Sequence, residues 1–397
     1  MQHSESVQKL AMRFGKKWAT AGRHMENLKE NAMQVARLQR HYSCLSAAGF
    51  LTPMKTLHDT AAPSRGRTEL KKAVTAPKPT NGALASHPGV QVATNGNGHA
   101  NGEDYDTLEI RELKPANCKP RFEINSKAVI NDGSAFGHKK LCDGLTFTAG
   151  HACAFSCTYC YVPGMLFQNK RLNAIKRERK LKPEDFTVEI ADAPAKVREY
   201  LTVGGDTAKP KYKDPGDQRV IFASPLVDVA GNLSQVEVTV AMCLEILKLT
   251  HWHIRLLSKS ALLRKVAEQI PAEFKQRVIY GLSTGTVDNG IASAIEKGAP
   301  SVAKRLETLH WLQENGYRTY GMICPILPQK DEAAYREFAE QAAAQINLGK
   351  CERVWAEVLN SRGDSLDSTT LALRQAGRHD EADLLDKVAN DKEAWQE

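Results

Sequence analysis

The sequence contains no run of 18 apolar residues, and its first twenty residues carry charges throughout, with no apolar core segment among them. These absences argue against a membrane-spanning helix and a secretory signal peptide. We therefore expect a cytoplasmic protein with no membrane partner. With 42% hydrophobic and 25% charged residues among 397, the chain is neither wholly disordered nor collagen-like, and it is long enough to form a large core.

Cysteines are few and unevenly placed. The chain has nine, an odd number, and three of them fall between Cys153 and Cys160. A disulfide framework would favour an even number at regular spacing, whereas clustering is typical of metal ligation in a reducing compartment.

The net charge of +8 belongs to the N-terminal part of the chain. Residues 1–75 contain 13 Lys and Arg against 5 Asp and Glu, while the remainder contains 41 of each sign. Such a basic arm attracts polyanions over a short, salt-sensitive range of about 8 Å. Solubility is the alternative explanation for this charge.

Two regions precede the main domain. Apolar residues spaced by three and four from Val7 to Leu38 predict a basic amphipathic helical arm within residues 1–56. This arm could fold back on the main domain, pair with a partner helix or lie along nucleic acid. We expect a flexible linker over residues 57–106, because residues 76–102 have five Gly, four Asn, three Pro, one charge and no aromatic residue.

Residues 107–360 alternate short β-rich runs with helical stretches, which indicates parallel strands joined by crossover helices. The predicted strands are Leu145–Thr148, Val220–Ala223, His253–Leu257, Val278–Leu282, Arg318–Cys324 and Arg353–Leu359. The predicted helices between them are Pro194–Leu201, Ser234–Leu249, Ala261–Ile270, Val302–Glu314 and Glu332–Ile346. The expected fold class is therefore α/β, a partial (β/α)6 TIM-like barrel with its site at the carboxyl ends of the strands. Residues 361–397 predict one or two acidic helices, such as Ser368–Gln375 and Asp380–Ala389, that close the open side of the barrel.

Cys153, Cys157 and Cys160 are spaced by three and by two residues, on a loop after the first predicted strand. Three thiolates leave a four-coordinate zinc site incomplete. The sequence also lacks a second ligand pair and the C-x2-C-x2-C spacing of bacterial ferredoxins. The alternative to a zinc or fortuitous grouping is a [4Fe–4S] cluster with one iron open to a further ligand.

This cysteine motif follows the first predicted strand and has Tyr159 directly before its last cysteine. In spacing and position it resembles the motif of the radical S-adenosylmethionine (SAM) superfamily. The resemblance implies that the three cysteines hold a [4Fe–4S] cluster and that the open iron chelates the amine and carboxylate of S-adenosylmethionine. It further implies that one electron from an external reductant cleaves the sulfonium to a 5′-deoxyadenosyl radical, which abstracts hydrogen from the substrate.

Within that superfamily, residues from Ser126 to Asn360 are similar to the spore photoproduct lyase and photolyase-like group. The resemblance implies that Ser224 and Ser283 hydrogen-bond the methionyl end of the cofactor and that Lys259 neutralises its carboxylate. Strand-end serines that cap helices, and a solvated lysine, are the structural alternatives. The matching pieces are Lys127–Asn131, Tyr159–Tyr161, Ser258–Lys259, Ser283, Arg305–Leu306 and Pro325–Pro328.

Tyr159 and Tyr161 match two tyrosines beside the cluster of the lyase, where the second serves in hydrogen-atom relay; shielding of the cluster from water is the alternative role for Tyr161. One departure concerns the hydrogen donor. The lyase carries a hydrogen-donating cysteine two residues before the serine matched by Ser224, but this sequence has Phe222 there. Cys324, at the end of the fifth predicted strand, is the candidate replacement, although lone cysteines in apolar strands are often simply buried.

A basic segment follows the cysteine loop. The segment Met165–Pro183 contains seven Lys and Arg residues and one acidic residue, Glu178, and Phe167 lies among them. A phosphate backbone requires such a surface, whereas a solvated helix face is the alternative. We predict that the substrate is a nucleic acid base or lesion that leaves its stack. Two interpretations compete with this one. The substrate could be a small metabolite or peptide, or the protein could be a non-enzymatic one that binds metal and nucleic acids.

Overall fold

The computed structural model of the chain describes residues 110–116, 119–126, 128–134, 141–166, 169–223, 225–360 and 364–390. The predicted N-terminal arm and linker lie outside the described residues, as do Ser224, Phe167 and Lys127. Within the described ranges, no helix is long and apolar enough to cross a membrane.

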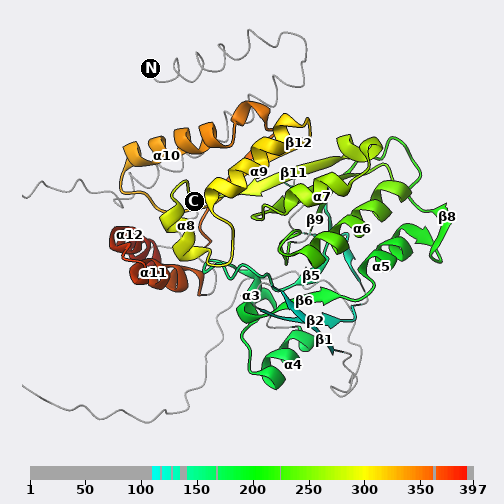
Figure 1. Cartoon of the computed structure of the whole chain (residues 1–397), viewed down its shortest axis with the longest axis horizontal. Helices are drawn as coiled ribbons and strands as arrows, with labels where there is room; N and C mark the ends of the chain where they lie inside the picture. Colours follow the sequence, from blue (N-terminus) through cyan, green and yellow to red (C-terminus); the bar gives the residue numbers. More distant parts are fainter. Residues whose placement is uncertain are drawn as a thin grey trace, which may run out of the picture. The chain divides into compact units, whose positions relative to one another are not determined.

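The main sheet has seven strands in the order β13-β12-β11-β10-β9-β4-β3 (Figure 1). Six of them, from β4 to β13, pair in parallel in the order of the chain, and β3 pairs antiparallel with β4. All six predicted strands are present, with small differences at their ends, and the α/β class is confirmed. The sheet is open, with β3 and β13 at its edges. The strands are β3 Ile130–Asn131, β4 Leu145–Phe147, β9 Val220–Ala223, β10 His253–Ser258, β11 Val278–Ser283, β12 Arg318–Ile326 and β13 Val354–Val358.

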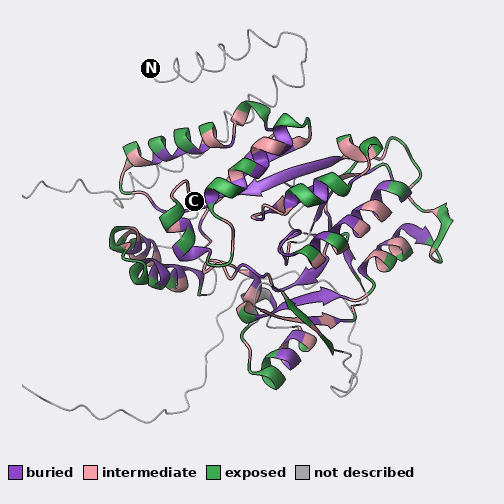
Figure 2. Cartoon of the chain, in the orientation of Figure 1, coloured by how far each residue is buried: buried purple, intermediate pink, exposed green. Residues whose placement is uncertain are grey.

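Helices connect these strands and bury one face of the sheet in the largest core (Figure 2). Side-chain N-caps begin α6, α8, α9 and α10, where Asn232, Asp288, Ser301 and Asp331 accept backbone N–H groups of the first turn. All five predicted crossover helices are present, and α8 is an additional short one. The helices are α5 Ala193–Leu201, α6 Leu233–Leu249, α7 Leu263–Gln269, α8 Asn289–Ile295, α9 Val302–Glu314 and α10 Glu332–Gln345, with 3-10 turns at η4 Ala272–Arg277 and η5 Leu348–Lys350.

Aromatic and aliphatic side chains fill the opposite face of the main sheet, because side chains alternate between the two faces along each strand. The Arg255 guanidinium lies 5.4 Å from the ring centre of Tyr320 and 4.9 Å from that of Trp355. The ring of Tyr320 crosses β11 at Gly281, where a Cβ atom would lie 2.1 Å from the ring. The buried members of this cluster are Leu141, Cys142, Phe222, Ile279, Tyr320, Met322 and Trp355.

A second sheet, which the sequence analysis did not predict, has four strands in the order β1-β2-β6-β5. Its parallel pair joins residues 121–124 of β2 to residues 187–190 of β6. Its core is separate from that of the main sheet and contains Phe122 and Phe186 in edge-to-face contact at 5.7 Å. The elements of this unit are β1 Ile110–Ala116, β2 Lys119–Ile124, β5 Gly150–His151, α3 Val162–Leu166, α4 Lys170–Arg179, η3 Pro183–Asp185 and β6 Thr187–Ile190. A β-hairpin, β7 Thr202–Val203 and β8 Asp206–Pro210, turns through Gly204 and Gly205 with positive φ.

The C-terminal part forms the helical hairpin α11 Ser365–Gln375 and α12 His379–Asn390. Both predicted helices are therefore present, and the turn between them uses Gly377 at a φ of 74°. Helix α11 contacts α8, and Arg378, in the turn between α11 and α12, donates to both carboxylate oxygens of Asp288, the N-cap of α8, at 2.9 and 3.0 Å. Figure 1 shows α11 and α12 beside α8.

Candidate active site

The three clustered cysteines lie on an irregular loop, residues 152–161, between β5 and α3; this segment is the cysteine loop below. Ala152 and Ser156 have φ values of 58° and 50°, and each directly precedes a cysteine. Left-handed backbone at non-glycine residues is costly and persists only where the surroundings impose it. The tertiary structure therefore turns the chain immediately before Cys153 and Cys157.

The second sheet and the α8–α9 connection both hold the cysteine loop. Lys119 of β2 donates from its ammonium group to the Ser156 hydroxyl and, at 2.7 Å, to the carbonyl of Glu184. On the other side, the Gly298 N–H donates to the carbonyl of Phe155 at 2.9 Å. A Cβ at Gly298 would lie 2.8 Å from the loop backbone, so only glycine permits this close approach.

The middle of the cysteine loop is bound to α8 and α11. The Thr158 N–H donates to the carbonyl of Ile295 at 2.9 Å. The hydroxyl of Thr158 and that of Thr369, on α11, lie 3.0 Å apart. The C-terminal hairpin therefore contacts the loop that carries the cysteines, which its sequence did not reveal.

The three thiols influence one another electrostatically. Burial raises the pKa of Cys153 to about 12, and it raises those of Cys157 and Cys160; at Cys153 and Cys157 a nearby carboxylate, Asp228 or Glu296, and the other thiolates add to the rise. Among the described residues, no three His, Cys, Asp or Glu side chains gather as ligands of a single metal ion would. In a [4Fe–4S] cluster each thiolate binds a different iron, and these three thiols are the residues that could hold one. Binding would displace their three protons.

Three of the predicted site residues meet at the carboxyl ends of adjacent strands. The Lys259 ammonium, after β10, donates to the hydroxyl of Ser283 at 2.8 Å, and that hydroxyl donates to the carbonyl of Cys324 at 3.0 Å. The Cys324 thiol lies 3.9 Å from a carboxylate oxygen of Glu357 on β13. The placement at strand ends agrees with the expectation, whereas Ser224 falls outside the described residues.

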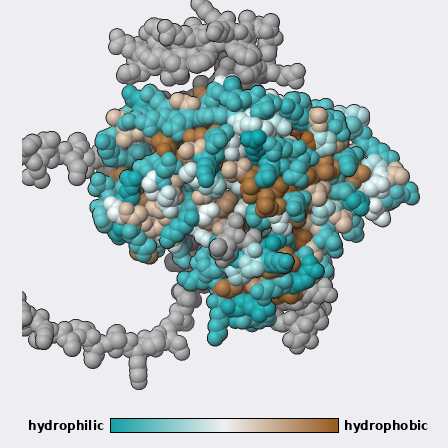
Figure 3. All heavy atoms as spheres, in the orientation of Figure 1, coloured by the Kyte–Doolittle hydropathy of each residue, from teal (hydrophilic) through white to brown (hydrophobic). Residues whose placement is uncertain are grey.

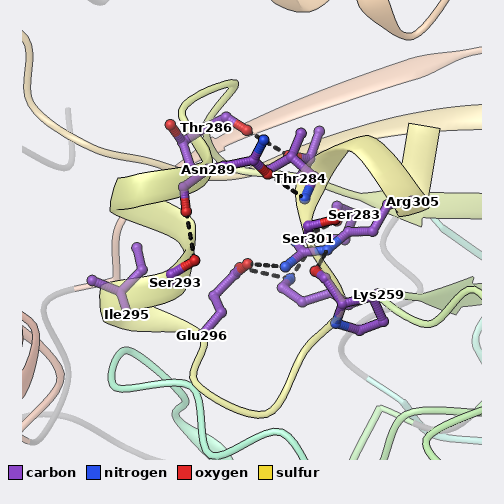
Figure 4. A network of polar contacts seen from close by, with 12 residues as sticks. Lys259, Ser283, Thr284, Thr286, Asn289, Ser293, Ile295, Glu296, Ser301 and Arg305 are labelled. Carbon is purple, nitrogen blue, oxygen red and sulfur yellow. Dashed lines mark hydrogen bonds and ion pairs between the residues drawn. The ribbon is translucent and has the colours of Figure 1, made fainter. Parts of the chain in front are cut away.

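Glu296, which the sequence analysis missed, connects these residues to the cysteine loop (Figure 4). Its carboxylate accepts hydrogen bonds from the Tyr159 hydroxyl and from the Arg305 guanidinium, and it lies 3.7 Å from the Lys259 ammonium. Glu296 immediately follows α8, the helix that was not predicted. Its side chain is 2% exposed and that of Arg305 is 1% exposed, so the charges are nearly removed from water.

The charge of Lys259 is maintained by its surroundings. Burial acts to lower the pKa of Lys259, but the negative charge of Glu296 opposes this effect, and the pKa is raised above its usual value. The ammonium also lies 5.6 Å from the ring centre of Tyr159. A protonated lysine at this position fits the carboxylate of an amino acid ligand.

Asp228 is a second residue that the sequence did not reveal. One carboxylate oxygen accepts from the backbone N–H of Lys259 at 2.8 Å, and the other accepts from the Ser258 hydroxyl at 2.7 Å. Asp228 therefore fixes the backbone on which Lys259 is carried. Burial raises the pKa of this carboxyl group, and the hydrogen bonds from Ser258 and the backbone oppose that rise.

Tyr161 lies on the second sheet's side of the cysteine loop. Its hydroxyl donates to the carbonyl of Pro225 at 3.1 Å, and its ring packs with Cys160 against the second core. Phe222, which the sequence analysis matched to the lyase's cysteine, is buried among the aromatic residues of the main sheet. Burial raises the pKa of the Cys324 thiol to about 12, so this sulfur carries its hydrogen at neutral pH.

Most of the basic segment forms α4, which follows the cysteine loop and α3. Leu172, Ala174 and Ile175 are buried, and Leu172 and Ile175 belong to the core that Cys160 and Tyr161 contact. Figure 3 shows a hydrophilic surface over this helix. The exposed cationic residues are Lys170, Lys176, Arg177, Arg179, Lys180 and Lys182.

Comparison with known proteins agrees with the cysteine motif. Residues 148–342 match the family model of the radical SAM superfamily. An uncharacterized protein of Acidianus two-tailed virus, ORF301, is 24% identical over 291 residues, covering 71% of this chain and 85% of that protein.

Solved structures of spore photoproduct lyase are distantly similar. A double mutant with bound AdoMet and dinucleoside spore photoproduct is 13% identical, with a TM-score of 0.43, and the match covers 62% of this chain and 64% of that one. A tyrosine-to-phenylalanine mutant is also 13% identical, with a TM-score of 0.44 and coverage of 63% and 65%. The chain thus spans less than two thirds of the length of these lyases, and likeness at this level assigns neither substrate nor site residues.

Residues 148–342 carry a radical SAM domain, and the protein is a radical SAM enzyme. Members of this superfamily use a [4Fe–4S] cluster and S-adenosylmethionine, which are accordingly its cofactors. This assignment removes the non-enzymatic interpretation.

Proposed function

We propose that this radical SAM enzyme acts on a base or lesion of a nucleic acid. The observation that carries the proposal is the place of α4. Its exposed cations are carried by a helix whose buried face rests on the same core as Cys160 and Tyr161. A phosphate backbone on this helix would border the cysteine loop, and cationic surfaces of this kind supply the sequence-independent part of nucleic acid affinity.

In this proposal Cys153, Cys157 and Cys160 hold the cluster. Lys259 pairs with the carboxylate of S-adenosylmethionine, and Ser283, with Ser224, hydrogen-bonds its methionyl end. A [4Fe–4S] cluster held there and reduced by an external one-electron donor would supply the chemistry for reductive cleavage of S-adenosylmethionine. Tyr159, held by Glu296 beside Lys259, shields this region from water.

Cys324 is the proposed hydrogen donor to the substrate. Its thiol is protonated at neutral pH and lies near the carboxyl end of β12. It is close enough to Lys259 and Tyr159 to interact electrostatically with both side chains. Phe222 supplies no hydrogen atom of comparable reactivity at the position used in the spore photoproduct lyase. We propose Tyr161 as the relay that returns hydrogen to the cofactor side.

The resemblance of motifs to the spore photoproduct lyase group favours a nucleobase over a metabolite. One of the solved lyases is complexed with a dinucleoside spore photoproduct. For the present chain, Phe222 argues that the reaction is a relative of that repair and not the same one. The site chemistry supports hydrogen abstraction from a base held outside its stack.

Nucleic acid binding tests the proposal. Replacing two exposed lysines of the basic segment, Lys176→Ala with Lys182→Ala, should weaken binding to DNA and RNA oligonucleotides and reduce the slope of log affinity against log salt by about 2, since each lysine contact to a phosphate contributes about 1. The measurement is fluorescence anisotropy at several salt concentrations.

The matched control is Lys248→Ala with Lys350→Ala, two exposed lysines outside the second sheet, for which the slope should not change. Cleavage of S-adenosylmethionine without nucleic acid should stay at the wild-type rate in both variants. If the wild-type protein shows no salt-dependent affinity for either nucleic acid, a small-metabolite or peptide substrate replaces this proposal.

A further inference from the structure

The buried network of Figure 4 contains one acid and two bases. Glu296 is negative, whereas Arg305 and Lys259 are positive, and all three side chains are largely shielded from water, at 2%, 1% and 14% exposure. Within these three residues two opposite charges cancel and one positive charge is left over, and the buried carboxyl group of Asp228 lies against the Lys259 backbone. Buried charges need partners, so the contacts of each base decide which of them can still take an anionic ligand.

The division of contacts shows which base has the surplus charge. Arg305 donates to the carbonyl of Pro300 at 2.8 Å, to that of Ser283 at 3.3 Å and to the carboxylate of Glu296. Its guanidinium therefore has a partner at each nitrogen. Lys259 makes one hydrogen bond, to Ser283, and remains 3.7 Å from Glu296, beyond hydrogen-bond length. The surplus charge is on Lys259.

The other ionisable groups near Lys259 add to this balance but do not change between the variants considered below. Asp228 accepts hydrogen bonds from Ser258 and from backbone N–H groups in each of them. The thiol of Cys324, against Glu357, and the hydroxyl of Tyr159 are retained in all of them. Glu357 is likewise unchanged.

We propose that Arg305 is a positioning residue: by occupying Glu296, it keeps Lys259 available for the carboxylate of S-adenosylmethionine and so sets the affinity of a cofactor that it does not touch. The inference rests on the role proposed above for Lys259. It is independent of the nucleic acid proposal, because cofactor binding is measured without any substrate.

Three variants change the net charge of the network in known steps. Arg305→Met leaves Glu296 to pair with Lys259, which brings the net charge to zero. Glu296→Gln keeps an acceptor for Tyr159 and raises the net charge by one. The double variant Arg305→Met with Glu296→Gln leaves Lys259 alone and restores the wild-type net charge.

Affinity for S-adenosylmethionine should follow this charge. Equilibrium dialysis with the unreduced holoprotein should show binding weakened about tenfold or more in Arg305→Met, the size expected when a charged hydrogen bond is lost. The double variant should recover to within about threefold of wild type, and Glu296→Gln should bind at least as well as wild type. Arg305→Lys, which keeps the charge, should also retain affinity.

Decarboxylated S-adenosylmethionine is the matched probe, because it lacks the group that Lys259 is proposed to bind. Its affinity should not differ among the variants by more than about twofold. Equal losses for both ligands, or a double variant as weak as Arg305→Met, would overturn the inference and indicate a purely structural role. A wild-type holoprotein that binds neither ligand would overturn it as well.

Iron content and thermal unfolding of each variant establish that the holoprotein is intact. If Arg305→Met does not fold without its buried guanidinium, the comparison of wild type, Glu296→Gln and the double variant still decides the matter. A tenfold loss of cofactor affinity in either folded variant contradicts the proposal.

Discussion

The two sheets of this protein differ in how they are built and in what they carry. The main sheet is a series of adjacent parallel strands whose carboxyl ends bring together Lys259, Ser283 and Cys324. The second sheet joins strands from distant parts of the chain and carries the basic helix α4. The cysteine loop runs from the second sheet and packs against α8 and the α8–α9 connection.

This difference indicates a division of roles. In the proposed function the main sheet presents groups for the cofactor and the second sheet presents a surface for a polyanionic substrate, while the cysteine loop contacts elements of both. A defect in the second core should therefore disturb the loop more than one in the main core, because Cys160 and Tyr161 pack on the second core. Only changes at the loop itself should abolish cofactor cleavage with the fold intact. The following predictions, in order of decreasing effect, test that comparison.

Removal of one loop cysteine should have the largest effect. Cys157→Ala removes one of three thiolates, so the anaerobically reconstituted protein should contain little iron and its reductive cleavage of S-adenosylmethionine should fall to background. Product 5′-deoxyadenosine, measured by chromatography, reports this loss. Cys243→Ala, which removes a buried thiol from α6 in the main core, should retain both iron and activity. Cleavage by the Cys157→Ala protein would contradict the assignment of the loop.

A cavity in the second core should distinguish the effects of the two sheets on the cysteine loop. Phe186→Ala should destabilise the protein by about 3–5 kcal/mol and lower the iron content per chain, since Cys160 and Tyr161 rest on that core. Leu247→Ala, on α6, should cost about 2–5 kcal/mol but leave the iron content of the folded protein unchanged. Thermal unfolding and iron analysis measure both effects. Equal iron loss in the two variants would show that the cores do not act separately on the loop.

The smallest effect is expected where the C-terminal hairpin meets the loop. Thr369→Val removes the hydroxyl contact to Thr158 and should cost about 1 kcal/mol, with release of iron to a chelator faster by up to about fivefold. Thr239→Val, which removes a buried hydroxyl bonded to the Val229 carbonyl, should cost a similar amount without changing iron release. An unchanged release rate in Thr369→Val would limit the hairpin to a structural role.

The sequence predicted the main sheet well because its signals are local. Each parallel strand is a short apolar run followed by an amphipathic helix, so burial can be inferred from neighbouring residues. Residues at the ends of such strands must gather at one edge, which is why Lys259, Ser283 and Cys324 were expected together. The roles assigned to these residues, and to Ser224 and Tyr161, remain predictions.

The second sheet was missed because its strand partners are far apart in the chain. β2 pairs with β6 across the whole cysteine loop and α4, and no periodicity in either segment indicates the other. The short β5, two residues long, gives no strand signal at all. Glu296 was missed for a related reason, since α8 is a seven-residue helix containing Gly290 and was not predicted.

The sequence alone determined the α/β class, the order of the main strands and the cysteine motif, because these depend on residue type and local spacing. Only the tertiary structure decided that Glu296 would lie between Tyr159, Arg305 and Lys259. Charges on separate elements acquire their pairing from three-dimensional packing, and in a site nearly free of water that pairing determines which charge remains available to a ligand.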